Sequence, residues 1–175
     1  MNLEAEILKE HSKRQVVKIG KWIGHDRARF KKLMDLFLHG EYRTTQRSAW
    51  LVSYCGEQYP ELITPWLPAM LKKMEEPGVH VAVKRNVLRI LQDVDIPPEL
   101  LGTVAKLSFD YLALADSPIA VKAFSMTVLA NIAKQEPGIK HELQVMIELM
   151  LPYAGPGILS RGRRVLKQLS EMHGP

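Results

Sequence analysis

The chain has 175 residues, of which 46% are apolar and 25% charged, a composition typical of one folded globular domain and not of a disordered segment. Its single cysteine, Cys55, excludes an internal disulfide and a zinc site built on several thiolates, and it favours a reducing compartment. No apolar run approaches the roughly 20 residues of a membrane-spanning helix, and residues 1–25 lack the apolar core of a signal peptide. We therefore expect a cytoplasmic protein.

The net charge of +5 is concentrated at the two ends of the chain. Residues 1–32 carry nine Lys or Arg and four acids, residues 33–160 carry eleven and fourteen, and residues 161–175 carry four and one. A protein that follows a nucleic-acid backbone along its length needs cations throughout. The distribution weakens a nucleic-acid interpretation without removing it, and it favours solvated helix surfaces at the two ends.

Helical periodicity dominates the chain. Three segments place apolar residues at steps of three and four, which puts them on one face of a helix. In chain order these are Phe30, Leu33, Met34, Phe37 and Leu38; Leu100, Val104, Leu107, Tyr111 and Leu114; and Ile139, Leu143, Met146, Ile147 and Met150. Asp26 provides an N-cap for the first of these helices and Gly40 ends it. No segment alternates with period two and no Asn-Gly or Asp-Gly hairpin turn occurs, so the sequence predicts an all-α protein.

Proline and glycine divide the chain into segments of about 15 to 20 residues, each long enough for one helix. The breaks fall at Gly24, Gly40, Tyr59-Pro60, Pro77-Gly78, Pro97-Pro98, Ser117-Pro118, Pro137-Gly138 and Gly155-Pro156-Gly157. We expect the helix that follows Pro60 to begin near Pro65, because proline is tolerated in a first helical turn.

Three segments align with one another, over residues 46–54, 83–91 and 121–129. Each has a basic second residue, Arg47, Lys84 or Lys122, at steps of 37 and 38 residues, and residues 161–169 form a weaker fourth copy. A helix pair repeated every 37 to 43 residues, whose second helix opens with a basic residue after Val or Gln, resembles a HEAT repeat.

The resemblance implies an all-α fold, a short right-handed superhelix of HEAT-like helix pairs in which each pair buries apolar surface on the next. It implies a single domain over residues 1–175. The expected parts of this domain are a leading helix at about 2–22 and helix pairs at about 25–58, 60–94, 97–134 and 138–172.

HEAT units often connect through ion pairs between a basic residue and an acid six positions earlier. Glu41 with Arg47 and Asp116 with Lys122 have this spacing, whereas the other two copies lack the acid. We therefore expect structural ion pairs at these two positions, and we expect the charged ends of the chain to cap the stack.

The chain carries no phosphate-binding loop, dinucleotide fingerprint, zinc-binding helix or nucleophile elbow. We predict no catalytic residue, no metal site and no cofactor. Cys55 lies beside Leu51 and Val52 on a helical face, which indicates a buried and inert thiol. One enzymatic alternative stays open, because some DNA alkylation-repair glycosylases consist of HEAT-like repeats. Their functional residues do not match this chain position by position.

The second helices of a HEAT stack line its concave face, so their polar residues outside the apolar stripe point into that groove. We expect a mildly basic groove that binds an acidic or extended segment of a partner protein. Nucleic-acid binding and simple solvation of these side chains are the alternatives. The candidate partner-binding residues are Arg47, Arg85, Arg89, Lys122, Asn131, Arg164 and Lys167.

Overall fold

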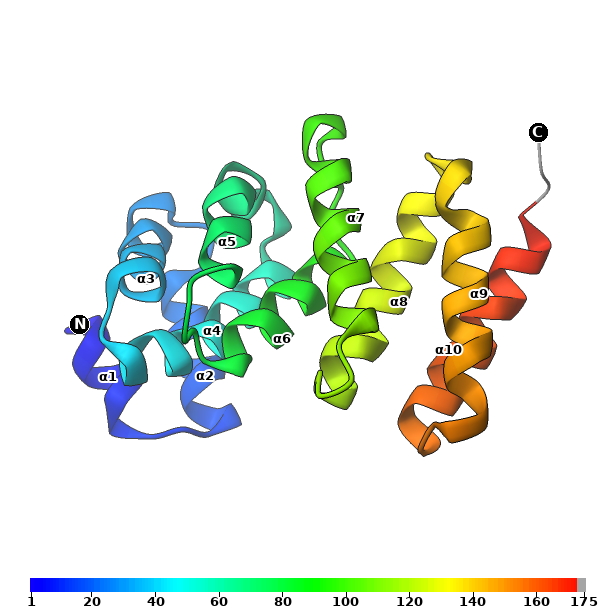
Figure 1. Cartoon of the computed structure of the whole chain (residues 1–175). Helices are drawn as coiled ribbons and strands as arrows, with labels where there is room; N and C mark the ends of the chain where they lie inside the picture. Colours follow the sequence, from blue (N-terminus) through cyan, green and yellow to red (C-terminus); the bar gives the residue numbers. More distant parts are fainter. Residues whose placement is uncertain (173–175) are drawn as a thin grey trace. The chain divides into compact units, whose positions relative to one another are not determined.

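A computed structural model describes residues 1–172 of the chain. Over this range the chain forms ten α-helices, a few short 3-10 helices and no β-strand, so the all-α prediction is confirmed. The α-helices are α1 (Leu3–Lys9), α2 (Lys13–Ile23), α3 (Arg27–His39), α4 (Tyr42–Gln58), α5 (Leu67–Met74), α6 (Val81–Leu91), α7 (Pro98–Ala113), α8 (Ile119–Ala133), α9 (Lys140–Met150) and α10 (Pro156–Glu171) (Figure 1).

The described chain gathers into two compact units. The first unit is Met1–Asp95 and holds α1 to α6, and the second begins at Ile96 and holds α7 to α10. The boundary falls between the second and third expected helix pairs, just before Pro97-Pro98, where proline interrupts helical hydrogen bonding.

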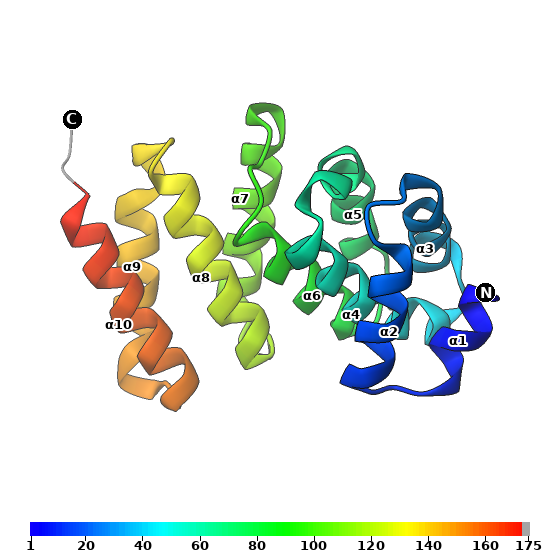
Figure 2. The same ribbon diagram turned by 180° about the vertical axis from the view of Figure 1, so that it is seen from behind.

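Helix α4 is the centre of the first unit and packs against α1, α2, α3 and α6. The predicted apolar face of α3 is confirmed, because Phe30, Leu33, Met34 and Phe37 are at most 1% exposed. Figure 1 shows α3 and α5 side by side along one side of α4 and α6, and Figure 2 shows α2 lying across α4 from behind. The second helices α4 and α6 and the leading helix α2 therefore share a surface within this unit.

The expected leading helix over residues 2–22 is in fact two helices, α1 and α2, which pack against each other. The first ends at Lys9, and Ser12 starts the second, because its side chain accepts a hydrogen bond from the backbone N–H of Gln15 at 3.2 Å. The buried Gln15 amide then donates to the Glu6 carbonyl oxygen at 2.7 Å, which fixes the turn. The Ser12-x-x-Gln15 spacing is an N-cap signal that predicts this break.

Local signals place the ends of the other helices in the first unit. Asp26 caps α3 by accepting hydrogen bonds from the N–H groups of Ala28 and Arg29, and Gly40 follows its last residue, as predicted. Helix α5 begins at Leu67, slightly later than the expected Pro65, because two short 3-10 helices, η1 (Pro60–Leu62) and η2 (Thr64–Trp66), precede it.

Helix α8 is the centre of the second unit and packs against α7, α9 and α10. The core of this unit contains Met126, Leu129, Leu143, Ile147 and Val165, all at most 1% exposed. The predicted face of α7 is wrong at its end. Leu114 is 50% exposed because it follows the last helical turn in extended backbone, and so it leaves the stripe that the helical spacing assigned to it.

Candidate functional site

The seven candidate partner-binding residues divide between the two units. Arg47, Arg85 and Arg89 lie on α4 and α6 of the first unit. The second unit holds the other four, on α8 and α10: Lys122, Asn131, Arg164 and Lys167.

Arg47 anchors α1. Its half-buried guanidinium donates through Nη1 to the carbonyl oxygens of Ile7, at 3.5 Å, and of Leu8. The last carbonyls of a helix lack intrahelical donors and carry negative partial charge, so a cation is favourable there. The expected pair of Arg47 with Glu41 does not form between these two described residues, because the guanidinium is used on the end of α1.

Lys122 departs from its expected ion pair with Asp116 in a similar way. Its Nζ donates to the backbone carbonyl oxygen of Ala115 at 3.3 Å, and no ion pair with the Asp116 carboxylate forms between these described residues. The neutral acceptor lies in the turn before α8. Arg47 and Lys122 therefore both donate hydrogen bonds to backbone carbonyl oxygens. The spacing of charged residues in the sequence does not reveal such bonds.

A hollow of about 400 Å³ lies on the surface shared by α2, α4 and α6. We call it the Trp50 groove. It is lined by Lys13, Val16, Trp50, Ser53, Tyr54, Glu57, Gln58 and Arg89. Arg89 is the predicted residue that reaches it, and its Nη2 forms an ion pair with Glu57 Oε1 at 2.7 Å. This pair joins α6 to α4 at one wall of the groove.

Two cations, Arg47 and Arg85, act on His11 beside the Trp50 groove. The ring of His11 packs edge-on against Trp50, with 5.4 Å between the ring centroids. Burial lowers the pKa of His11, and the charges of Arg47 and Arg85 lower it further. The hydrogen bonds of Arg47 go to neutral carbonyls, so they leave its charge uncancelled. An anionic ligand would therefore be attracted to this end of the groove.

Two aromatic residues, Trp50 and Tyr54, form part of the lining, and both are half-buried. Burial is the main cause that raises the pKa of Tyr54. None of Trp50, Tyr54 and Lys13 was among the residues that the sequence predicted to bind a partner. The spacing of Trp50, Tyr54 and Glu57 at four and three residues on one helix is a signal that could have found the groove.

The predicted residues of the second unit do not line the Trp50 groove. Asn131 accepts a hydrogen bond from Lys134 at 3.2 Å, Lys167 lies 3.9 Å from Glu171, and Arg164 is exposed. The cation that joins α10 to α8 is Arg161, which the sequence did not single out as a structural residue. Its Nη1 donates to the carbonyl oxygen of Ala123 at 3.2 Å and to Thr127 Oγ1 at 2.7 Å.

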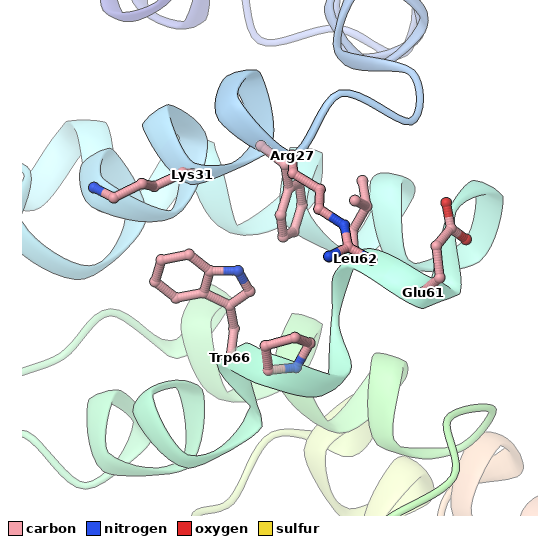
Figure 3. A pocket seen from close by; sticks show the side chains of 7 residues that line it. Arg27, Lys31, Glu61, Leu62 and Trp66 are labelled. Atoms are coloured by element: carbon pink, nitrogen blue, oxygen red, sulfur yellow. The ribbon is translucent and has the colours of Figure 1, made fainter.

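A second hollow, of about 350 Å³, lies between α3 and the η1–η2 segment. We call it the Trp66 pocket (Figure 3). It is lined by Arg27, Phe30, Lys31, Glu61, Leu62, Pro65 and Trp66. Its helices differ from those of the Trp50 groove, so the two hollows are separate sites of the first unit.

Nucleophilic and metal chemistry find little support in the described residues. Cys55 is fully buried, and burial raises the pKa of its thiol to about 12, so the prediction of a buried, inert thiol is confirmed. Residues 1–172 contain no group of three or more His, Cys, Asp or Glu that could hold a metal ion. None of the helices in this range has the length and apolar character needed to cross a membrane.

Comparison with known proteins identifies the family. Residues 3–169 match the HEAT repeat domain family. No curated protein and no solved structure matches the chain. HEAT repeat domains generally serve as protein-interaction scaffolds and are typically not enzymes. The match covers nearly the whole described chain, and the four aligned segments lie on α4, α6, α8 and α10, so this chain belongs to the HEAT repeat domain family.

Proposed function

We propose that the protein is a binding module that holds an acidic, extended segment of a partner protein at the Trp50 groove. One observation carries the proposal: cations and half-buried aromatic rings converge on a hollow of about 400 Å³ on the shared surface of α2, α4 and α6. Tryptophan, tyrosine and arginine are the residues that most often dominate the binding energy of protein interfaces.

The parts of the groove have distinct roles in this proposal. Trp50 and Tyr54 offer flat apolar surface to the partner's side chains, while Arg89 on α6 and Lys13 on α2 attract its carboxylates. Arg85, on α6 but outside the lining, adds positive charge near His11. Arg89 is held in place by Glu57, which reduces the entropy it would lose on binding.

Within the second unit, Lys122, Asn131, Arg164 and Lys167 stay predicted contact residues. We propose a cytoplasmic location, in keeping with the single free thiol.

Charge reversal at Arg85 and Arg89 tests the proposal. The matched control is Lys32→Glu with Arg43→Glu, which changes the net charge equally at exposed positions of α3 and α4 outside the groove lining. Affinity capture from the native host, followed by mass spectrometry, should lose its specific partners with the groove variant and keep them with the control. The single variant Arg85→Glu, which breaks no ion pair among the described residues, checks that the loss does not reflect unfolding. An unchanged set of partners for all variants contradicts the proposal.

Nucleic-acid binding is the second candidate. Proteins also bind single strands by stacking the bases on aromatic side chains while nearby cations contact the phosphates. A gel shift with a single-stranded oligonucleotide at low salt separates the two functions. Binding that weakens steeply with salt and is lost on charge reversal supports this candidate. Lack of binding at micromolar protein removes it. The glycosylase activity of some HEAT-like proteins requires release of a base from alkylated DNA, and an assay for that release tests this alternative.

A further inference from the structure

The Trp66 pocket has an apolar interior and a charged rim. Its apolar lining consists of Phe30 and Leu62, which are 1% and 3% exposed, together with Trp66 and Pro65. Figure 3 shows the Trp66 indole flanking the opening and the Arg27 side chain reaching toward Leu62, while Lys31 extends away from Arg27. A volume of about 350 Å³ is at the lower end of what ligand-binding pockets provide, which suits one large side chain with its neighbour.

Two of the three charged residues at the rim have partners of their own. Glu61 Oε1 lies 2.6 Å from His25 Nδ1, and Lys31 Nζ lies 2.8 Å from Asp35 Oδ2. Arg27 forms no hydrogen bond or ion pair with the described residues, although its charge adds to the causes that lower the pKa of Glu61, of which the His25 hydrogen bond is the largest. The guanidinium at the pocket mouth can therefore accept an anionic partner.

Apart from its charge interaction with Glu61, Arg27 stands at a position where its own helix does not favour a cation. Arg27 is the first residue of α3, where the positive end of the helix dipole disfavours a cation, and α3 has no acid in its first turn. Arg29, two residues later, differs because it pairs with Asp26 and stacks on Trp22. Arg27 has no such local role, so the structure keeps an exposed cation at an electrostatically unfavourable place beside an apolar pocket.

We propose that the Trp66 pocket binds a large apolar or aromatic side chain of a partner polypeptide whose adjacent residue is acidic. The apolar side chain fills the space over Phe30 and Leu62, and the acidic carboxylate pairs with Arg27. The amide groups at the start of α3 add positive partial charge to the same rim. This site is independent of the Trp50 groove, so it presents a second attachment point for a partner on the first unit.

Nuclear magnetic resonance of the full ¹⁵N-labelled chain tests the proposal with three blocked dipeptides: N-acetyl-Asp-Phe-amide, N-acetyl-Lys-Phe-amide and N-acetyl-Asp-Gly-amide. The Trp66 indole N–H, assigned with a Trp66→Phe variant, should shift with about millimolar affinity for the Asp-Phe probe. The Lys-Phe probe should bind about three- to fivefold more weakly, as expected for one solvent-exposed ion pair. The Asp-Gly probe should leave the resonance unmoved, because it cannot fill the pocket.

The decisive comparison is between Arg27→Glu and Lys32→Glu. Both reverse one charge on α3, but Lys32 lies outside the pocket lining. An acid at the first position of α3 complements the helix dipole, and this offsets the repulsion that it introduces toward Glu61, so Arg27→Glu is not expected to weaken folding. The proposal requires Arg27→Glu to prefer the Lys-Phe probe and Lys32→Glu to keep the Asp-Phe preference. A Trp66 resonance that does not respond to the Asp-Phe probe, or an equal preference in both variants, overturns it. Either result leaves the test at Arg85 and Arg89 unaffected.

Discussion

The ring of Tyr54 on α4 rests directly on the backbone of Gly20 on α2. A methyl group built on Gly20 would overlap Tyr54 Cε1 and Cδ1. The absence of a side chain at Gly20 therefore lets α2 approach α4 and holds the Tyr54 ring in the lining of the Trp50 groove.

Gly20→Ala should destabilise the first unit by about 1–3 kcal/mol, because the added methyl group must displace a half-buried ring. Urea denaturation followed by tryptophan fluorescence measures this, since Trp22, Trp50 and Trp66 all lie in the first unit. The control is Gly102→Ala on α7, where no atom lies within 4 Å of the added methyl group. Gly102→Ala should stabilise the second unit by about 0.5–1 kcal/mol, which urea denaturation followed by circular dichroism measures. A gain for Gly20→Ala would contradict the close approach.

Arg47→Met should loosen α1, because the carbonyls of Ile7 and Leu8 would lose their donor at a cost of about 1–3 kcal/mol. Hydrogen exchange of the backbone amides in α1 measures the effect, and exchange should become faster than in the native protein. Arg43→Met, one turn earlier on α4 and exposed, should leave the exchange unchanged. Equal exchange of α1 in both variants would mean that Arg47 does not anchor this helix.

Lys73→Met should destabilise the first unit by about 1–3 kcal/mol. Lys73 is 9% exposed, and its Nζ donates to the Leu38 carbonyl oxygen at 2.8 Å and to Glu76 Oε2 at 2.6 Å. Methionine keeps the packing but leaves the carbonyl near the end of α3 without this donor. The neighbouring Lys72→Met removes the same charge from an exposed site in the same turn, and it should cost less than about 1 kcal/mol. Similar midpoints in urea for the two variants would refute the anchoring role of Lys73.

Cys55 should make the free energy of unfolding decrease at alkaline pH. Burial raises the pKa of its thiol to about 12, whereas the pKa of a cysteine thiol in an unfolded chain is about 8.5. Between these values the unfolded state has lost a proton that the folded state retains, so stability falls as pH rises, by about 1.4 kcal/mol per pH unit. Urea denaturation of the native protein and of Cys55→Ala at a series of pH values measures the contribution. The variant should show the shallower decline, and parallel declines would show that the thiol is not shielded.

Several predictions from the sequence depended on local chemistry, and the structure confirms them. The spacing of Phe30, Leu33, Met34 and Phe37 fixed the buried face of α3, and Asp26 fixed its start. The break at Ser12 has an equally local cause, so it could have been predicted from the Ser12-x-x-Gln15 spacing.

The candidate site was predicted only in part. Arg89 was identified from its place on a second helix, and it lines the Trp50 groove. Arg47 was assigned an acidic partner because Glu41 has the right spacing, but it bonds the end of α1, forty residues away along the chain. A charged spacing in the sequence cannot show which carbonyls a guanidinium will reach, because that depends on where a distant helix packs.

The sequence by itself determined that the chain is helical, where α3 begins and ends, and which of its residues are buried, since helical periodicity and capping act within a few residues of one another. The tertiary structure alone decided which cations became anchors, as Arg47, Lys73 and Arg161 did, and which stayed exposed, as Arg85 did and as Arg27 did beside a hollow. The physical reason is that burial and hydrogen bonding of a long charged side chain depend on backbone groups brought near by packing, and those groups are chosen by the contacts between helices and not by the local sequence.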